Sequence, residues 1–145
     1  SNYNKAPTEK KTKLLYYTTI ADQLDNALTC KDYILEEEKN NSKKFIKENY
    51  LTTYFIEAID TKNIYLDKKE CKTYLDYFYF AFTLLLRSLN NDDIQKVLPK
   101  LDCKKILSTF NFFKELFDVR LESKIKNKVL NIIDDSLKDF NCKAK

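Results

Sequence analysis

The stretch YLDYFYFAFTLLLRSLNN, residues 74–91, is the most apolar part of this chain and decides its fold class. Its apolar run, from Tyr77 to Leu86, is about ten residues long, whereas a membrane-spanning helix needs about 18 or more. Asp76 and Arg87 bound the run closely. Apolar residues recur at steps of three and four, the spacing of one helix face. The face comprises Cys71, Tyr74, Leu75, Phe78, Phe82, Leu85 and Leu89. The stretch therefore predicts a buried helix, and neither a membrane span nor a strand.

The ends of this helix are marked by capping residues. Asp67-x-x-Glu70 has the pattern of a helix start, in which the aspartate caps the backbone and the glutamate reaches back. A second asparagine pair, Asn90-Asn91, marks its end. We therefore expect a helix over residues 67–89.

Similar patterns predict helices on both sides. A narrow apolar stripe at helical spacing predicts a long helix over about residues 9–39. The stripe comprises Leu14, Tyr17, Ala21, Leu24 and Leu28. Ser42 follows an asparagine pair and marks the start of a second helix over about residues 42–61. Two consecutive stripes predict a last long helix over about residues 103–140, with room for a kink at 118–121.

The predicted fold class is all-α, an up-down-up-down four-helix bundle. A short extra helix before Pro99 and the last long helix is compatible with the pattern, because the residue before a proline avoids helical geometry. Residues 1–8 are polar and are expected to form a flexible N-terminal segment. Residues 9–142 are expected to form a single helical-bundle domain, because 145 residues suffice for one hydrophobic core.

Missing residue types exclude several classes of function. The chain contains no glycine and no histidine. Without glycine there is no phosphate-binding loop and no dinucleotide-binding turn, and without histidine the commonest general base and metal ligand are missing. No motif arranges the other reactive side chains for catalysis. We therefore expect a protein that is not an enzyme, with no catalytic, cofactor-binding or metal-binding residues, no cofactor and no small-molecule substrate.

The four cysteines, Cys30, Cys71, Cys103 and Cys142, are too widely spaced for a metal or redox motif. In the predicted bundle, the first and third lie at one end and the second and fourth at the other. We therefore predict the disulfides Cys30–Cys103 and Cys71–Cys142, each stabilising by about 4 kcal/mol through the long loop it closes. Such bonds imply an oxidising compartment. The alternative is four reduced cysteines that serve as small core side chains.

Charge and exposure indicate few interaction sites. Lysines occur in clusters, but acidic residues are interleaved and the formal net charge is only +4, which is typical of solvated helix faces and argues against nucleic-acid binding. Phe80 lies on the helix face opposite the predicted core. It is a candidate contact for a membrane or a partner. Alternatively, residues 94–98 cover it and it has no role in binding.

A glycine-free helical chain of this length, rich in lysine and asparagine and with four dispersed cysteines, resembles the mature part of secreted malaria-parasite proteins. Among these it is similar in outline to the sporozoite proteins essential for cell traversal, which are small helical bundles. The resemblance implies a protein that is secreted or held at the parasite surface or in a secretory organelle. Its partners would be host membranes or surface proteins. No functional residue is carried over, because no motif can be matched.

Poxvirus Bcl-2-like proteins are a second lysine- and asparagine-rich helical group of this size, although the Asn-Trp-Gly-Arg signature of classical Bcl-2 proteins is absent here. This resemblance implies an intracellular adaptor that binds a partner helix in a groove. The expected function is therefore a secreted non-enzymatic effector at host-cell membranes or, as the alternative, such an adaptor. The redox state of the cysteines discriminates between the two, because cytosolic thiols stay reduced.

Overall fold

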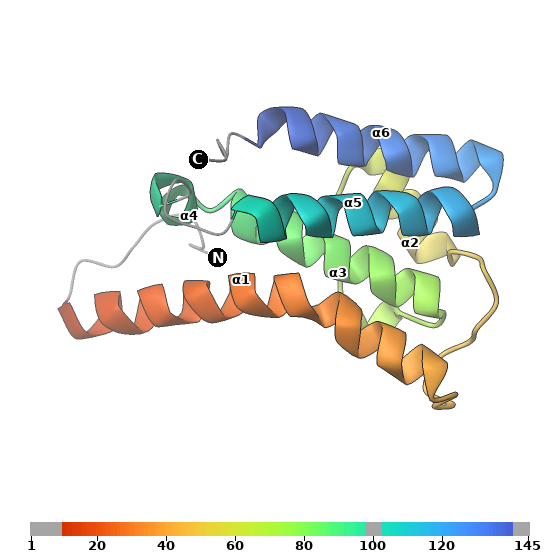
Figure 1. Cartoon of the computed structure of the whole chain (residues 1–145), viewed down its shortest axis with the longest axis horizontal. Coiled ribbons are helices and arrows are strands. Elements are labelled where there is room, and N and C mark those ends of the chain that lie inside the picture. The colour runs from red at the N-terminus through yellow and green to blue at the C-terminus, as the bar shows by residue number, and fades with distance from the viewer. Residues whose placement is uncertain (1–9, 98–102, 141–145) are drawn as a thin grey trace.

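A computed structural model of the chain describes residues 10–97 and 103–140, and these ranges contain α-helices and one 3₁₀ turn but no β-strand. The elements are α1 (Lys10–Lys39), α2 (Thr53–Thr61), η1 (Lys68–Glu70), α3 (Tyr74–Leu89), α4 (Asp92–Val97), α5 (Cys103–Arg120) and α6 (Ser123–Asp139). Figure 1 shows α1, α3, α5 and α6 as the four long helices. The prediction of an all-α fold is confirmed.

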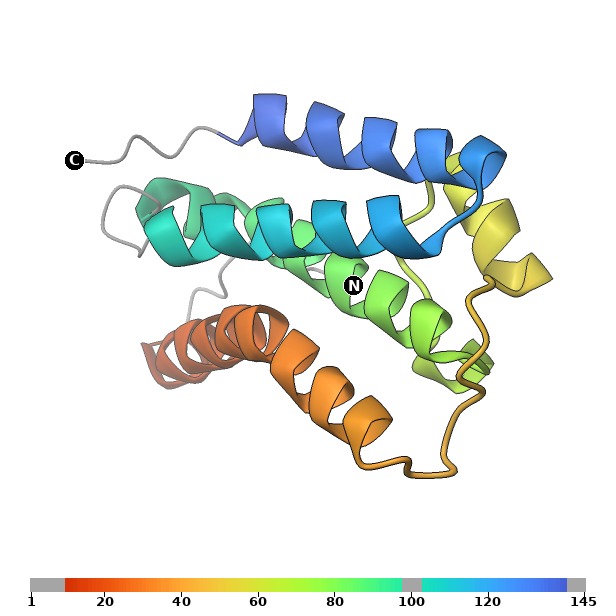
Figure 2. The ribbon, with the colours of Figure 1, turned by 45° about the vertical axis from the view of Figure 1, so that its right-hand side comes forward.

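Helix α3 lies at the centre of the molecule. It packs along α1 on one side and against α5 on another, while α6 packs on α5 and on the short α2 (Figure 2). Fourteen of its 16 residues are buried, which confirms that the aromatic stretch is the core helix. No helix in the described ranges is long and apolar enough to cross a bilayer.

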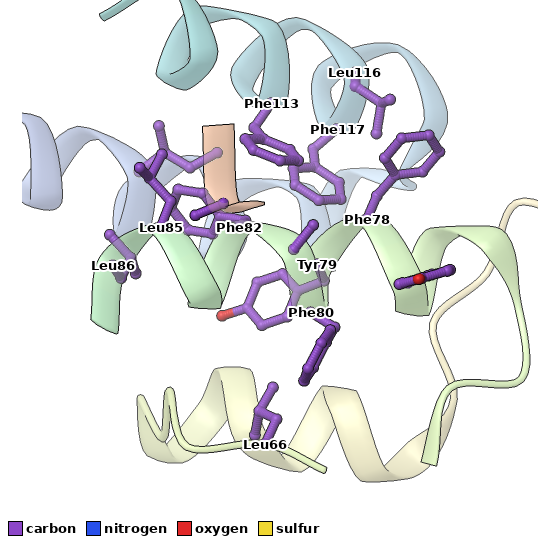
Figure 3. Packing of buried hydrophobic residues seen from close by; sticks show 14 of the residues in the cluster. Leu66, Phe78, Tyr79, Phe80, Phe82, Leu85, Leu86, Phe113, Leu116 and Phe117 are labelled. Atoms are coloured by element: carbon purple, nitrogen blue, oxygen red, sulfur yellow. The ribbon is translucent and has the colours of Figure 1, made fainter. Parts of the chain in front are cut away.

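Aromatic rings join α3 to α5. The ring of Phe82 lies edge-on to those of Phe110 and Phe113, with centroids 6.0 and 5.5 Å away. Phe113 in turn stacks on Phe117 at 6.1 Å. Figure 3 shows Phe113 and Phe117 pointing from α5 onto α3. Such pairs add about 0.5–1.5 kcal/mol each beyond the area they bury, so this contact is a major source of stability.

Helix α3 begins later than predicted, because the second of two capping patterns starts it. Asp67 caps only η1, where its carboxylate accepts from the backbone N–H of Lys69 at 3.0 Å. Thr73 caps α3: its hydroxyl accepts from the backbone N–H of Asp76 at 2.9 Å. The Asp76 carboxylate accepts from the backbone N–H of Thr73 at 3.2 Å, which completes a capping box.

The predicted second helix is wrong in its first half. Only Thr53–Thr61 is helical, and the chain before it is irregular. There the backbone N–H of Ile46 donates to the carbonyl of Lys72 at 2.9 Å, and the carbonyl of Ile46 accepts from Tyr74 at 3.0 Å. This bridge brings the chain back to the start of α3, so α1 ends and α3 begins at the same end of the molecule (Figure 1).

The predicted last helix is two helices. It breaks at Leu121-Glu122 and reverses direction, so α6 runs back along α5 (Figure 1). Arg120 anchors the reversal: its guanidinium donates to both oxygens of Glu38 on α1, at 2.7 and 2.9 Å, and lies 5.5 Å from the ring centre of Phe78. The kink expected at 118–121 is therefore a complete turn, and the four long helices are α1, α3, α5 and α6 rather than the four predicted segments. The expected short helix is present as α4.

Candidate functional site

The first half of α1 exposes apolar side chains. At the start of the predicted stripe, Leu14 and Tyr17 are 71% and 43% exposed. Leu24 and Leu28, further along the same stripe, are buried. Leu15, beside them on the helix, is 66% exposed. Figure 1 shows the reason, since this half of α1 extends beyond the ends of α3 and α5. We call Leu14, Leu15 and Tyr17 the α1 apolar patch.

A groove between α1 and α4 continues this patch. Its volume is about 360 Å³, and its lining includes Tyr17 and Ala21 on α1 and Ile94 on α4. The hydroxyl of Tyr16 donates to the carboxylate of Asp93 at 2.9 Å and thereby holds α4 against α1. Tyr17 belongs to both the patch and the groove, so the two adjoin along α1.

No protein-family model, no curated protein and no solved structure matches this chain. Its surfaces and buried groups are therefore the basis for inferring function.

The cysteines do not pair as predicted. Cys30 and Cys71 carry free thiols, so neither Cys30–Cys103 nor Cys71–Cys142 is formed. Cys103 is buried and disulfide-bonded, and Cys142 lies outside the described residues.

The predicted pairing is wrong because it requires a full-length second helix and an unbroken last helix. Cys30 lies in the second half of α1 and Cys71 just before α3, at the end of the molecule that these two helices share (Figure 1). Cys103 opens α5 at the opposite end. The two free thiols instead lie within electrostatic range of one another and of Lys68.

We expect Cys71 to resist alkylation in the folded protein. Burial raises the pKa of its thiol from 9.0 to about 12, and the nearby Asp76 carboxylate acts in the same direction. At pH 8 the folded state then holds roughly a thousandfold less of the reactive thiolate than the unfolded state. Iodoacetamide labelling followed by mass spectrometry, with and without denaturant, measures this ratio of rates.

The matched control is Cys30. Burial also raises the pKa of its thiol, but the Lys68 ammonium acts in the opposite direction and the side chain is only half-buried, so it should react faster. Equal alkylation rates for Cys71 with and without denaturant would contradict the expectation.

The raised pKa of Cys71 also implies that the free energy of unfolding declines between about pH 9 and 12, because the thiol ionises first in the unfolded state.

Phe80 is not the exposed aromatic that its position on the helix predicts. Only 7% of the residue is exposed. The guanidinium of Arg87 lies 5.9 Å from the ring centres of both Phe80 and Tyr65. Figure 3 shows the Phe80 ring pointing toward the segment that carries Leu66. The segment after α2 therefore lies over the helix face that the periodicity assigns to solvent.

Asp76 is a polar core residue that the apolar periodicity of α3 does not predict. Its carboxylate is fully buried and accepts from the backbone N–H and the hydroxyl of Thr52, both at 3.0 Å. It also accepts from the backbone N–H groups of Lys72 and Thr73, at 3.0 and 3.2 Å. Thr73-x-x-Asp76 is itself a capping pattern, and this signal was available in the sequence.

Acidic and sulfur-bearing side chains do not gather into a metal site: in the described ranges, no three His, Cys, Asp or Glu residues are placed to hold an ion. Among the described residues, the α1 apolar patch holds two of the three most exposed large apolar side chains, Leu14 and Leu15.

Proposed function

We propose that this protein is a non-enzymatic helical-bundle effector that attaches to a membrane surface through the first half of α1. Following the resemblance to malaria-parasite proteins, we propose that it is secreted and acts on host-cell membranes during traversal or invasion. The observation that carries the proposal is the exposure of Leu14 and Leu15 on a helix that extends beyond its neighbours.

The chemistry of this helix suits a lipid surface. Interfacial helices insert apolar side chains at the headgroup boundary while lysines interact with anionic lipids. The sequence of the first turn of α1 is rich in lysine, and Lys13 is exposed beside the two leucines. Burying one leucine in an apolar environment contributes about 1.5–3 kcal/mol, so two leucines add at most about 3–6 kcal/mol, and the lysines add their attraction to anionic lipids.

An intracellular adaptor remains the alternative. The groove between α1 and α4 favours it, because an amphipathic partner helix binds through apolar anchors at helical spacing. At about 360 Å³ the groove offers room for only a few such anchors. The continuous exposure of Leu14 and Leu15 beyond the groove favours the membrane over a partner helix.

We expect the double variant Leu14→Glu/Leu15→Glu to bind vesicles at least about tenfold more weakly than the unmodified chain, because two charges replace two apolar contacts. The measurement is flotation with vesicles of phosphatidylcholine and phosphatidylserine. Both leucines are exposed, so the thermal unfolding midpoint should stay unchanged.

The control variant is Val119→Glu, which introduces a charge at an 82% exposed position on α5 and should not alter vesicle binding. The membrane proposal is wrong if the unmodified chain does not float with vesicles. It is also wrong if the double variant and the Val119 variant bind equally well.

A further inference from the structure

A cavity of about 530 Å³ opens between α3, α5 and α6, on a part of the molecule that does not include α1. Its apolar lining consists of Ile64, Leu86, Leu89, Phe110, Ile132 and Phe140. This volume lies within the range of about 300–1,000 Å³ that is usual for small-molecule sites.

One buried polar group faces this cavity. Tyr79 lines it and is 1% exposed, yet its hydroxyl forms no hydrogen bond with any described residue. No side-chain oxygen in the described ranges is wholly enclosed without a partner, so this hydroxyl must reach the cavity. Figure 3 shows it pointing along α3 toward the end at which Leu86 lies. Buried hydroxyls are normally hydrogen-bonded, and this one has an unused capacity.

The charges around the cavity balance. Lys62 and Lys138 carry positive charge and Asp135 and Asp139 negative charge, and all four are exposed. The site therefore has no net preference for an anion or a cation. Burial raises the pKa of Tyr79, so its hydroxyl keeps its proton and acts as a donor.

We propose that this cavity binds a neutral, lipid-like molecule that carries a carbonyl oxygen. The apolar body packs against the aliphatic and phenyl side chains, and the carbonyl oxygen accepts a hydrogen bond from the Tyr79 hydroxyl. The site is separate from the α1 apolar patch, so it stands or fails independently of the proposed membrane attachment.

The test uses Prodan, a neutral naphthalene ketone whose emission responds to polarity and to hydrogen bonding at its carbonyl. Titration into the unmodified chain should give saturable binding with blue-shifted emission. Tyr79→Phe should weaken binding by about three- to tenfold, the usual effect of one hydrogen bond. The emission of the bound probe should shift further to the blue, because its carbonyl has lost the donor.

Two controls separate the site from general stickiness. Tyr65→Phe removes a hydroxyl from a 59% exposed residue outside this cavity and should change neither affinity nor emission. Ile132→Trp places a large side chain in the cavity and should abolish saturable binding.

A competition experiment tests the hydrogen bond without relying on any variant that fills the cavity. 2-Dodecanone should displace Prodan about three- to tenfold more effectively than dodecane from the unmodified chain, and equally well from the Tyr79→Phe variant. Non-saturable binding by the unmodified chain would overturn the proposal. Equal affinity and emission in the Tyr79→Phe variant would overturn it as well.

Discussion

Replacing Asp76 by alanine is expected to lower the free energy of unfolding by about 4 kcal/mol, because the change leaves several buried hydrogen-bond donors without an acceptor. Its carboxylate accepts four hydrogen bonds from Thr52, Lys72 and Thr73 and is wholly shielded from solvent. These bonds join the start of α2 to the start of α3. The loss should therefore affect the cooperative unfolding of the whole domain.

Asp76→Asn should have a smaller effect, about 2–3 kcal/mol, because one amide oxygen still accepts while the amide N–H₂ faces donors. Urea unfolding followed by far-UV circular dichroism measures both variants. The control is Asp118→Ala, which removes a 62% exposed carboxylate that lies 3.8 Å from Lys126 and should cost less than about 0.5 kcal/mol. An Asp76→Ala variant within 1 kcal/mol of the unmodified chain would show that these bonds contribute little.

Phe82→Ala is expected to lower the free energy of unfolding by about 3–5 kcal/mol, since it removes a fully buried ring and leaves a cavity. The Phe82 ring lies within ring-contact distance of Tyr79, Phe110 and Phe113, at 6.0, 6.0 and 5.5 Å. Removing it therefore weakens the contact between α3 and α5 at its centre. Phe82→Leu keeps much of the volume and should cost less than about 1.5 kcal/mol.

The same urea titration measures these variants. Val119→Ala, at an 82% exposed position on α5, is the matched control and should change stability by less than about 0.5 kcal/mol. If Phe82→Ala cost no more than Phe82→Leu, the ring would not be packed as the structure shows.

Helix α3 was predictable because its signal is local. The spacing of its apolar residues, its length and the bounding Asp76 and Arg87 are all visible in one stretch of sequence. Burial of the opposite face was not predictable from that pattern. It depends on the segment after α2, which brings Leu66 and Tyr65 over α3 and covers Phe80.

The two errors of segmentation have non-local causes. Phe45 and Ile46 carry a helix-like apolar pattern, but the backbone of Ile46 forms hydrogen bonds with Lys72 and Tyr74. These partners lie too far along the chain to fall in the short sequence window from which a helix is predicted. The break after Arg120 has neither glycine nor proline, and the ion pair with Glu38 on α1 anchors it.

These two errors also account for the incorrect cysteine pairing. The short α2 and the break between α5 and α6 each change the end of the molecule at which the following segment begins. The predicted disulfides required each cysteine to lie at a particular end. In the sequence, the α1 apolar patch is recognisable only as part of the apolar stripe predicted for the first helix. Its exposed half could be recognised only once the lengths of α3 and α5 were known.

The projection of α1 beyond its neighbours gives one helix two local stabilities. Around Ala27 and Ile34, both wholly buried, amide hydrogens should exchange only when the domain unfolds. Around Leu14 the helix has little tertiary support, and isolated helical segments shorter than about 12–15 residues are marginal in water. We therefore expect the end of α1 around Leu14 to fray and re-form while the core stays intact. A membrane surface that binds this end of α1 would favour its helical form. The affinity would then depend on how many residues become ordered on contact.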